Sequence, residues 1–173
     1  TSHGSLNLEL RSDLCPRTCE NFLLLLERGY YDRTPFHRLI RNFMIQGGDI
    51  VSGDGKGGES IFGGQFDDEY LTGKFDAPGM VAMANGGRNM NGSQFFITVA
   101  DEQDHLDDKY TIFGEVSEGL DVAKKIGSTY IDGEGRPSSC GSVHDSHDIF
   151  PCLHGHGERT THTQTDGTTI ETH

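Results

Sequence analysis

The sequence contains no tryptophan, no long apolar run and few basic residues. No stretch approaches the roughly 20 consecutive apolar residues that a membrane-spanning helix needs, so we expect no membrane contact. Lysine and arginine number 14 against 27 aspartates and glutamates, and the formal charge is −13. Such a charge argues against nucleic acid as a partner, because phosphates need a positive surface. The four cysteines show no disulfide-dense spacing, which favours a reducing compartment, and we expect a cytoplasmic or nuclear protein.

The glycine content and the apolar periodicity predict short strands joined by many turns. The chain has 173 residues, 24 of them glycine, and 33% are hydrophobic. This length suits one domain with a buried core. Leu6, Leu8 and Leu10 alternate with polar residues, which predicts a half-buried strand. Further short strands are expected at 79–84, 94–99 and 111–116.

Two helices are predicted from apolar stripes of helical period. The first opens at Pro16, whose missing N–H costs nothing in a first turn, and Gly29 supplies its end. Its apolar stripe consists of Cys19, Phe22, Leu25 and Leu26. We favour a helix that plugs one end of a barrel over a leucine motif that binds a partner. A second helix is expected to start at Ser117 or Glu118 and to carry Leu120, Val122, Ala123 and Ile126.

The stretch 36–49 reads as two strands that meet at a tight corner. Apolar residues flank Arg41 and Asn42, and the second run ends in Gly47-Gly48. A guanidinium is costly to bury unpaired, so Arg38 is expected to line a cleft; a surface arginine on an edge strand is the alternative. The glycine-rich segment 53–58 suggests a phosphate loop only weakly, because its lysine does not stand in the GK[ST] position. A loop with several positive-φ residues explains it better.

Three ordered blocks of the sequence resemble the signature of one protein family. They are FHR at 36–38 with FMIQGGD at 43–49, MAN at 83–85 with NGSQFFI at 91–97, and HLD at 105–107 with YTIFG at 110–114. Over roughly residues 4–128 this pattern is similar to that of the cyclophilins, the peptidyl-prolyl cis/trans isomerases. The resemblance implies a mainly β fold: a closed eight-stranded antiparallel β-barrel capped by two α-helices. It implies an isomerase domain at 1–150, with the first strand truncated because the pattern begins before Thr1, and a polar C-terminal extension at 151–173.

The same resemblance implies an enzyme that isomerises X–Pro bonds of peptides and proteins with no cofactor and no metal. The chemistry requires no covalent step, because binding the twisted amide better than either planar form lowers the barrier of about 20 kcal/mol. The family pattern maps the catalytic positions onto Arg38, Gln46 and Phe43. It maps the substrate-binding positions onto Met44, Ala84, Asn85, Gln94, Phe96, His105, Leu106 and Tyr110. A charged guanidinium can donate to the pyramidal proline nitrogen of a twisted amide, and the apolar residues form a socket for the proline ring.

The sequence departs from the common cyclophilin pattern around this socket. His105 stands where many members carry tryptophan, the residue associated with strong cyclosporin binding, so we expect cyclosporin-type ligands to bind weakly. Tyr110 replaces a common histidine and keeps a flat ring with a polar tip. Gly64 and Gly86 stand where bulkier residues often gate the neighbouring pocket, so selectivity for the residue before X–Pro should be loose.

Several readings remain open beside the isomerase. A proline-recognition module that scaffolds a larger assembly with little turnover would share the groove. His105 with its neighbours resembles the nuclear, spliceosome-associated and U-box-linked cyclophilins, which implies spliceosomal proteins among the partners. His37 is expected to be structural and hydrogen-bonded within the barrel. A hydrolase built on Ser93 is disfavoured because no nucleophile-elbow pattern surrounds it.

A last strand is expected at 142–150. The tail holds a zinc-like set whose spacing matches no known metal pattern: Cys140, His144, His147, Cys152, His154 and His156.

Overall fold

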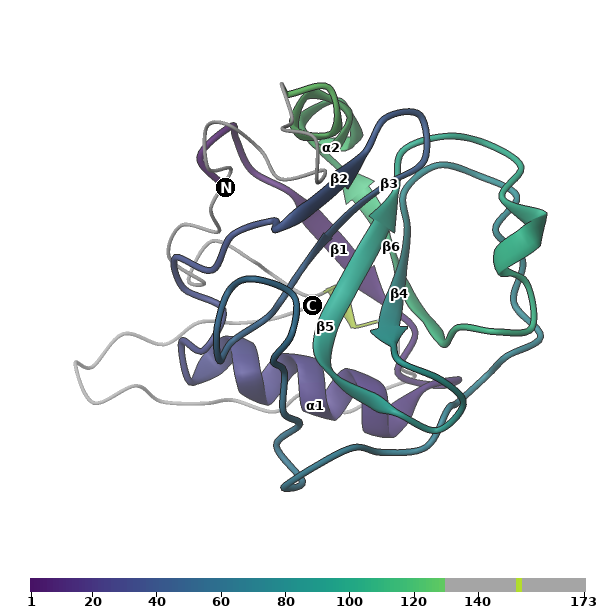
Figure 1. The fold of residues 1–173 in the computed structure, drawn as a ribbon. Coiled ribbons are helices and arrows are strands. Elements are labelled where there is room, and N and C mark those ends of the chain that lie inside the picture. Colours follow the sequence, from purple (N-terminus) through teal and green to yellow (C-terminus); the bar gives the residue numbers. More distant parts are fainter. Residues whose placement is uncertain (130–151, 154–173) are drawn as a thin grey trace.

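A single curved sheet organises the chain, seen in a computed structural model that describes residues 1–129 and the backbone of 152–153 (Figure 1). The order of its strands is β2-β3-β5-β4-β6-β1-β7. Their bounds are β1 Asn7–Leu10, β2 Arg38–Ile40, β3 Met44–Gly47, β4 Met80–Asn85, β5 Asn91–Thr98, β6 Ile112–Glu118 and β7 Cys152–Leu153. All neighbouring strands are antiparallel except β1 and β7. The prediction of a mainly β fold with two helices is confirmed.

The prediction of a closed eight-stranded barrel is wrong for the part of the chain that the structure describes. The sheet there is open, with β2 at one edge and the two-residue β7 at the other. Closure needs a ladder between the edge strands, and β2 pairs only with β3. The long connection from β3 to β4 adds no strand, since it contributes only the isolated bridges Ser60↔Gly64 and Phe66↔Asn91. The strand expected at 142–150 lies outside the described residues, as does the side chain of every member of the zinc-like set.

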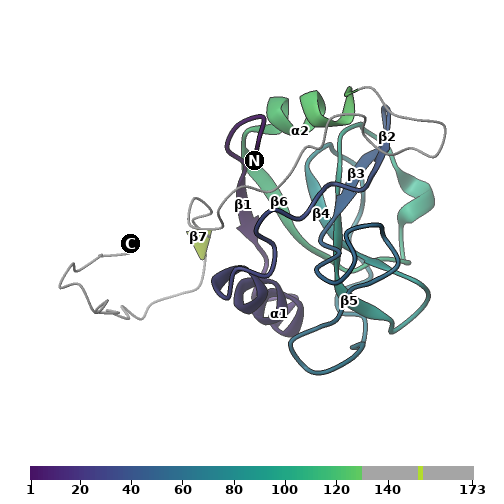
Figure 2. The same ribbon diagram turned by 60° about the vertical axis from the view of Figure 1, so that its left-hand side comes forward.

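The two helices lie at opposite ends of the sheet (Figures 1 and 2). Helix α1 runs from Pro16 to Glu27 and buries the predicted stripe against β5. Its Phe22 ring lies 5.4 Å from the ring of Phe95 and 5.2 Å from that of Phe113. Gly29 follows with a φ of +71°, in the left-handed region that ends helices. The first predicted helix is therefore confirmed.

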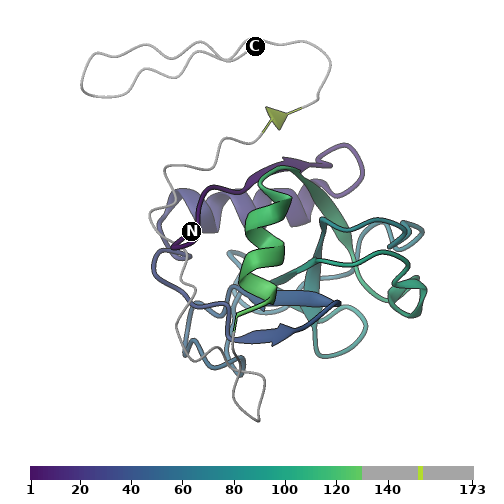
Figure 3. The same ribbon diagram turned by 90° about the horizontal axis from the view of Figure 1, so that it is seen from above.

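Helix α2 runs from Leu120 to Gly127 and begins later than predicted. The cause is the sheet: β6 extends to Glu118, which pairs with Asn7 of β1, and backbone groups engaged in that ladder cannot enter a helix. Ala123 and Ile126 are buried, and the helix packs over β2 and β3, as Figure 3 shows from above.

The sheet separates two apolar clusters because successive side chains of a strand point to opposite faces. Ile45, Val81 and Ile97 join the main core beneath α1 and α2. Their neighbours in sequence, Met44, Ala82 and Phe96, join a smaller cluster on the other face together with Phe75, Met80, Leu106 and Ile112. This second cluster forms the floor of the site described next.

Candidate active site

A cavity of about 310 Å³ opens on the face of the sheet that carries the smaller cluster. It is lined by Arg38, Phe43, Met44, Gln46, Ala84, Asn85, Phe96, His105, Leu106 and Tyr110. Ten of the eleven side chains that the sequence singles out thus meet in one place, although they come from β2, β3, β4, β5 and the segment 105–110. The eleventh, Gln94, lies beside them and lines a second cavity.

Aromatic rings hold the floor of this cavity in a fixed orientation. Phe96 is 5% exposed and is stacked on Phe75, with ring centroids 5.9 Å apart. The ring of Tyr110 meets it edge-on, at 5.3 Å and 85°. Met44 and Leu106 complete an apolar surface. A flat, dry floor of this kind suits the face of a pyrrolidine ring.

His105 lies on the rim of the cavity, in the 3₁₀ turn Asp104–Leu106. Its ring packs on Phe43 with centroids 5.1 Å apart at an angle of 42°. Lys109 donates from Nζ to the backbone carbonyl of His105 at 2.7 Å, which ties the turn to the following segment. The imidazole therefore occupies the rim with a smaller ring than the tryptophan common in the family.

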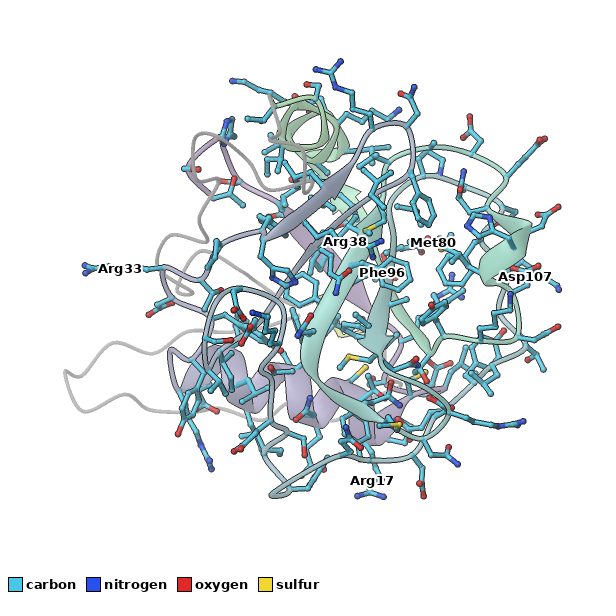
Figure 4. The ribbon with its side chains drawn as sticks, in the orientation of Figure 1. Arg17, Arg33, Arg38, Met80, Phe96 and Asp107 are labelled. Atoms are coloured by element: carbon cyan, nitrogen blue, oxygen red, sulfur yellow. The ribbon has the colours of Figure 1, made fainter. Side chains whose placement is uncertain are left out.

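The polar wall of the cavity carries Arg38. Its side chain lies opposite Gln46 in the β2–β3 register, and its Nη1 donates to Gln46 Oε1 at 3.4 Å. None of the ion pairs within residues 1–129 involves this guanidinium, which is exposed toward the cavity. Figure 4 shows Arg38 beside Phe96 near the middle of the sheet, whereas Arg17 and Arg33 point outward at the periphery. Arg38 thus presents free donors above an apolar floor.

The second cavity, of about 460 Å³, adjoins the first and shares Gln46, Ala84 and Asn85 with it. Gly86 lines it as expected. Gly64 does not: a Cβ at that position would have no neighbour within 4 Å, and Gln65 lines the cavity instead. Gly64 therefore does not border this cavity, and of the two glycines only Gly86 supports the expected wide entrance.

His37 is buried, but the prediction of hydrogen bonding is wrong for the described residues, where neither ring nitrogen has a partner. The ring packs against the glycine-rich loop, where a Cβ on Gly55 would lie only 2.8 Å from His37 Cδ2. Burial lowers the pKa of His37 below its ordinary value of 6.5, and the negative charge of the nearby Asp49 opposes the shift without reversing it. The imidazole is therefore neutral at physiological pH and acts as a packing element.

Other chemistries find little support in the described part of the chain. Ser93 is fully buried and donates its hydroxyl proton to the carbonyl of Gly48 at 2.6 Å, so it is no nucleophile. Residues 1–129 contain no cluster of three histidine, cysteine or carboxylate side chains that could hold a metal ion. Neither α1 nor α2 is long and apolar enough to cross a bilayer.

The sequence predicted no role for Asp49, yet its carboxylate accepts hydrogen bonds from the loop behind Gln94. A lone aspartate after two glycines carries no local sequence signal of such a role.

Comparisons with known proteins show which family the sequence resembles. Residues 1–146 match the family described as "Cyclophilin type peptidyl-prolyl cis-trans isomerase/CLD". "Peptidyl-prolyl cis-trans isomerase-like 1" of Neurospora crassa is 50% identical over 140 residues, which cover 80% of this chain and 85% of that protein. The human protein of the same name is 49% identical over 138 residues, or 79% of this chain and 82% of that protein.

A solved structure is similar as well. The cyclophilin-type isomerase of Cryptosporidium parvum superposes with a TM-score of 0.79 at 42% identity, covering 83% of this chain and 90% of that one. The same protein has been solved in the presence of the dipeptide Ala-Pro, with the same TM-score, identity and coverage of this chain and with 91% of that chain covered. The chain therefore belongs to the cyclophilin-type peptidyl-prolyl cis-trans isomerases.

Proposed function

We propose that this isomerase lowers the barrier of an X–Pro bond by holding the twisted amide between Arg38 and the apolar floor around Phe96. When the amide twists, resonance is lost and the lone pair returns to the proline nitrogen. A donor aimed at that nitrogen binds the twisted state better than the planar one, which is the condition for a faster rate. The observation that carries the proposal is a guanidinium with no ion-pair partner within residues 1–129, placed at the edge of an apolar cavity of about 310 Å³.

The magnitude required is compatible with such a site. Each 1.4 kcal/mol removed from the barrier gives tenfold, so an acceleration of about 10⁵ needs about 7 kcal/mol. One preorganised donor contributes about 3–4 kcal/mol in sites that exclude water. Orientation of the peptide by Asn85 and capture of the ring by Phe96 and Leu106 would supply the remainder.

The test compares Arg38→Ala with Arg41→Ala in a protease-coupled peptide assay. Arg41 is a matched control, because it lies three residues away, is exposed, and donates to the Ser128 carbonyl outside the cavity. Arg38→Ala should lower kcat/KM about 100- to 1,000-fold with peptide affinity nearly kept, whereas Arg41→Ala should leave both unchanged. An equally slow wild type would support the scaffold function instead, and an active Arg38→Ala would refute the mechanism.

We further propose the extent of the isomerase domain, the partners and the location that the family resemblance implies. The isomerase domain would be 1–150, followed by an extension at 151–173. The likeness of the His105 block to nuclear, spliceosome-associated cyclophilins supports spliceosomal proteins as partners and a nuclear or cytoplasmic location. Microscopy of the tagged chain tests the location, and co-purification with tagged spliceosomal proteins tests the partners.

The smaller rim ring at His105 supports weak binding of cyclosporin-type ligands.

A further inference from the structure

A buried carboxylate lies behind the active-site wall and receives an unusual number of hydrogen bonds. Asp49 is 1% exposed. Its Oδ1 accepts from the backbone N–H groups of Val51 and Ser52 at 3.1 and 3.0 Å. Its Oδ2 accepts from the N–H groups of Gly55 and Gly57 at 2.8 and 3.1 Å. The Ser52 hydroxyl lies 2.8 Å from the same oxygen and shares its single proton between Asp49 and Asp54 Oδ1, which is 2.7 Å away. Four backbone donors and this shared hydroxyl fix the course of the loop that follows β3.

The donor set requires the ionised form of Asp49. Burial by itself raises the pKa of this carboxyl, but hydrogen bonds from Ser52, Gly57 and Val51 outweigh it and hold the pKa well below its usual range. A protonated or amide side chain would direct a proton at N–H groups that are themselves donors. The loop is also built tightly around the group, since a Cβ on Gly57 would lie 2.6 Å from Asp49 Oδ1.

The same loop glycines face the active site with their carbonyl groups. Gln94 donates from Nε2 to the carbonyls of Gly55 and Gly57, at 3.0 and 2.5 Å. Both amide hydrogens of Gln94 are thereby engaged, and its Oε1 must point the other way. That oxygen accepts from Gln46 Nε2 at 2.9 Å.

The direction of this chain of hydrogen bonds determines what Arg38 meets. With its Nε2 donated to Gln94, Gln46 presents Oε1 to the guanidinium, and Arg38 Nη1 donates to it. If Gln46 were flipped, its NH₂ group would face the guanidinium and repel it; if Gln94 were flipped, its NH₂ group would face that of Gln46 and force Gln46 to flip. The acceptor beneath Arg38 is therefore oriented by the loop that the buried carboxylate holds.

We propose that Asp49 is a positioning residue for the isomerase reaction: it fixes the carbonyls of Gly55 and Gly57, which orient Gln94, Gln46 and finally Arg38. Asp49 touches no substrate, and its effect passes through the two glutamines. The inference rests on the proposed role of Arg38. It predicts a loss in kcat rather than in KM, since the apolar floor that binds the ring is not involved.

The experiment is a double-mutant cycle between Asp49→Asn and Gln94→Ala, with Asp54→Asn as the matched control. Asp54 lies in the same loop, is exposed and pairs with Lys56. It shares the Ser52 hydroxyl with Asp49 but makes no hydrogen bond to Gly55 or Gly57, so its substitution leaves the four backbone donors to Asp49 in place. In the otherwise wild-type chain, Asp49→Asn should lower kcat about tenfold and change KM less than twofold. In the Gln94→Ala background the same substitution should cost less than twofold, because the route to Arg38 is already cut. Asp54→Asn should leave kcat unchanged.

Spectroscopy provides a readout that simple destabilisation would not move. In folded Asp49→Asn, the ¹⁵N side-chain amide signals of Gln94 and Gln46 should shift or broaden, and in Asp54→Asn they should not. If Asp49→Asn does not fold, Ser52→Ala removes only the hydroxyl shared by Asp49 and Asp54, keeps the backbone donors, and should show the same coupling with a two- to threefold loss.

The outcomes separate the inference from the mechanism beneath it. A tenfold loss that persists in the Gln94→Ala background, or no loss in the folded variant, overturns the role of Asp49 and leaves that of Arg38 intact. Activity that survives Arg38→Ala overturns the proposed mechanism, and the positioning role with it.

Discussion

Phe96 and Ile97 are neighbours on β5 whose side chains lie on opposite faces of the sheet, and their truncation should separate activity from stability. Phe96 belongs to the cluster beneath the cavity, and Ile97 to the main core. Both are almost fully buried, at 5% and 1% exposure. Substitution of each by alanine removes a large side chain from a packed environment. Only Phe96→Ala, however, removes part of the surface that receives the proline ring.

The expected cost can be worked from the contacts. Phe→Ala in a core costs about 3–5 kcal/mol and Ile→Ala about 2–5 kcal/mol. Phe96 also loses its ring contacts with Phe75 and Tyr110, each contributing about 0.5–1.5 kcal/mol. Water can enter the space it leaves from the open cavity, which removes part of the cavity penalty. We therefore expect both variants to lose about 3 kcal/mol of unfolding free energy.

Activity should distinguish the two variants. At a temperature where both are folded, Phe96→Ala should raise KM and lower kcat/KM at least tenfold, whereas Ile97→Ala should stay within twofold of the wild type. Urea denaturation measures the stability, and the protease-coupled assay measures the activity of the folded fraction. Equal losses of kcat/KM in the two variants would refute the assignment of one face of β5 to the substrate, and so would a stable, fully active Phe96→Ala.

Two further predictions concern histidines at the site. The pKa of His37 is lowered in the folded state, so its contribution to stability is fully present above the unfolded value of about 6.5 and is lost as the pH falls from there toward the folded pKa. The unfolding free energy should therefore drop between pH 7.5 and 5.5, by less in His37→Gln, and an unchanged pH dependence in that variant would contradict the burial argument. His105→Trp should tighten cyclosporin binding at least tenfold, through a larger ring beside Phe43, and change kcat/KM less than threefold. Because the native sequence has no tryptophan, fluorescence of the introduced residue reports the titration directly, and unchanged affinity would exclude this position as the cause.

The local sequence pattern predicted the helices and strands better than it predicted how the strands pair and whether the sheet closes. The stripe from Cys19 to Leu26 and the alternation at Leu6, Leu8 and Leu10 record which face is buried, and the corresponding helix and strand are where they were expected. The predicted start of α2 was wrong because Glu118 is held in strand β6 by pairing with Asn7, which lies 111 residues away in the sequence. The prediction of a closed barrel was wrong for the described residues for a related reason, since pairing between distant edges leaves no mark in either strand.

The residues that line the site were predicted from the blocks that resemble the family signature. The hydrogen bonds that hold these residues in place were not predicted. Arg38 and Gln46 stand in a signature that can be read along the chain, and the structure places them opposite each other. Asp49 stands in the same signature, but its importance lies in backbone N–H groups up to eight residues later, whose direction no sequence pattern specifies. The failed expectation for His37 has the same origin, because the loop turns its backbone polar groups toward Asp49 and Gln94.

The two faces of the sheet have different roles: one packs against the main core and the other lines the active-site cavity. The paired strands β3 and β5 therefore contribute to both folding and catalysis. On β3, Met44 and Gln46 line the active-site cavity, while Ile45 between them is fully buried in the main core. A one-residue slip of this strand would exchange the two sets, so the packing of Ile45 and Ile97 also sets the position of Gln46 beneath Arg38. The register of the core is thus part of the catalytic geometry, and the ionised Asp49, two residues after the strand, holds the loop behind the remaining polar wall.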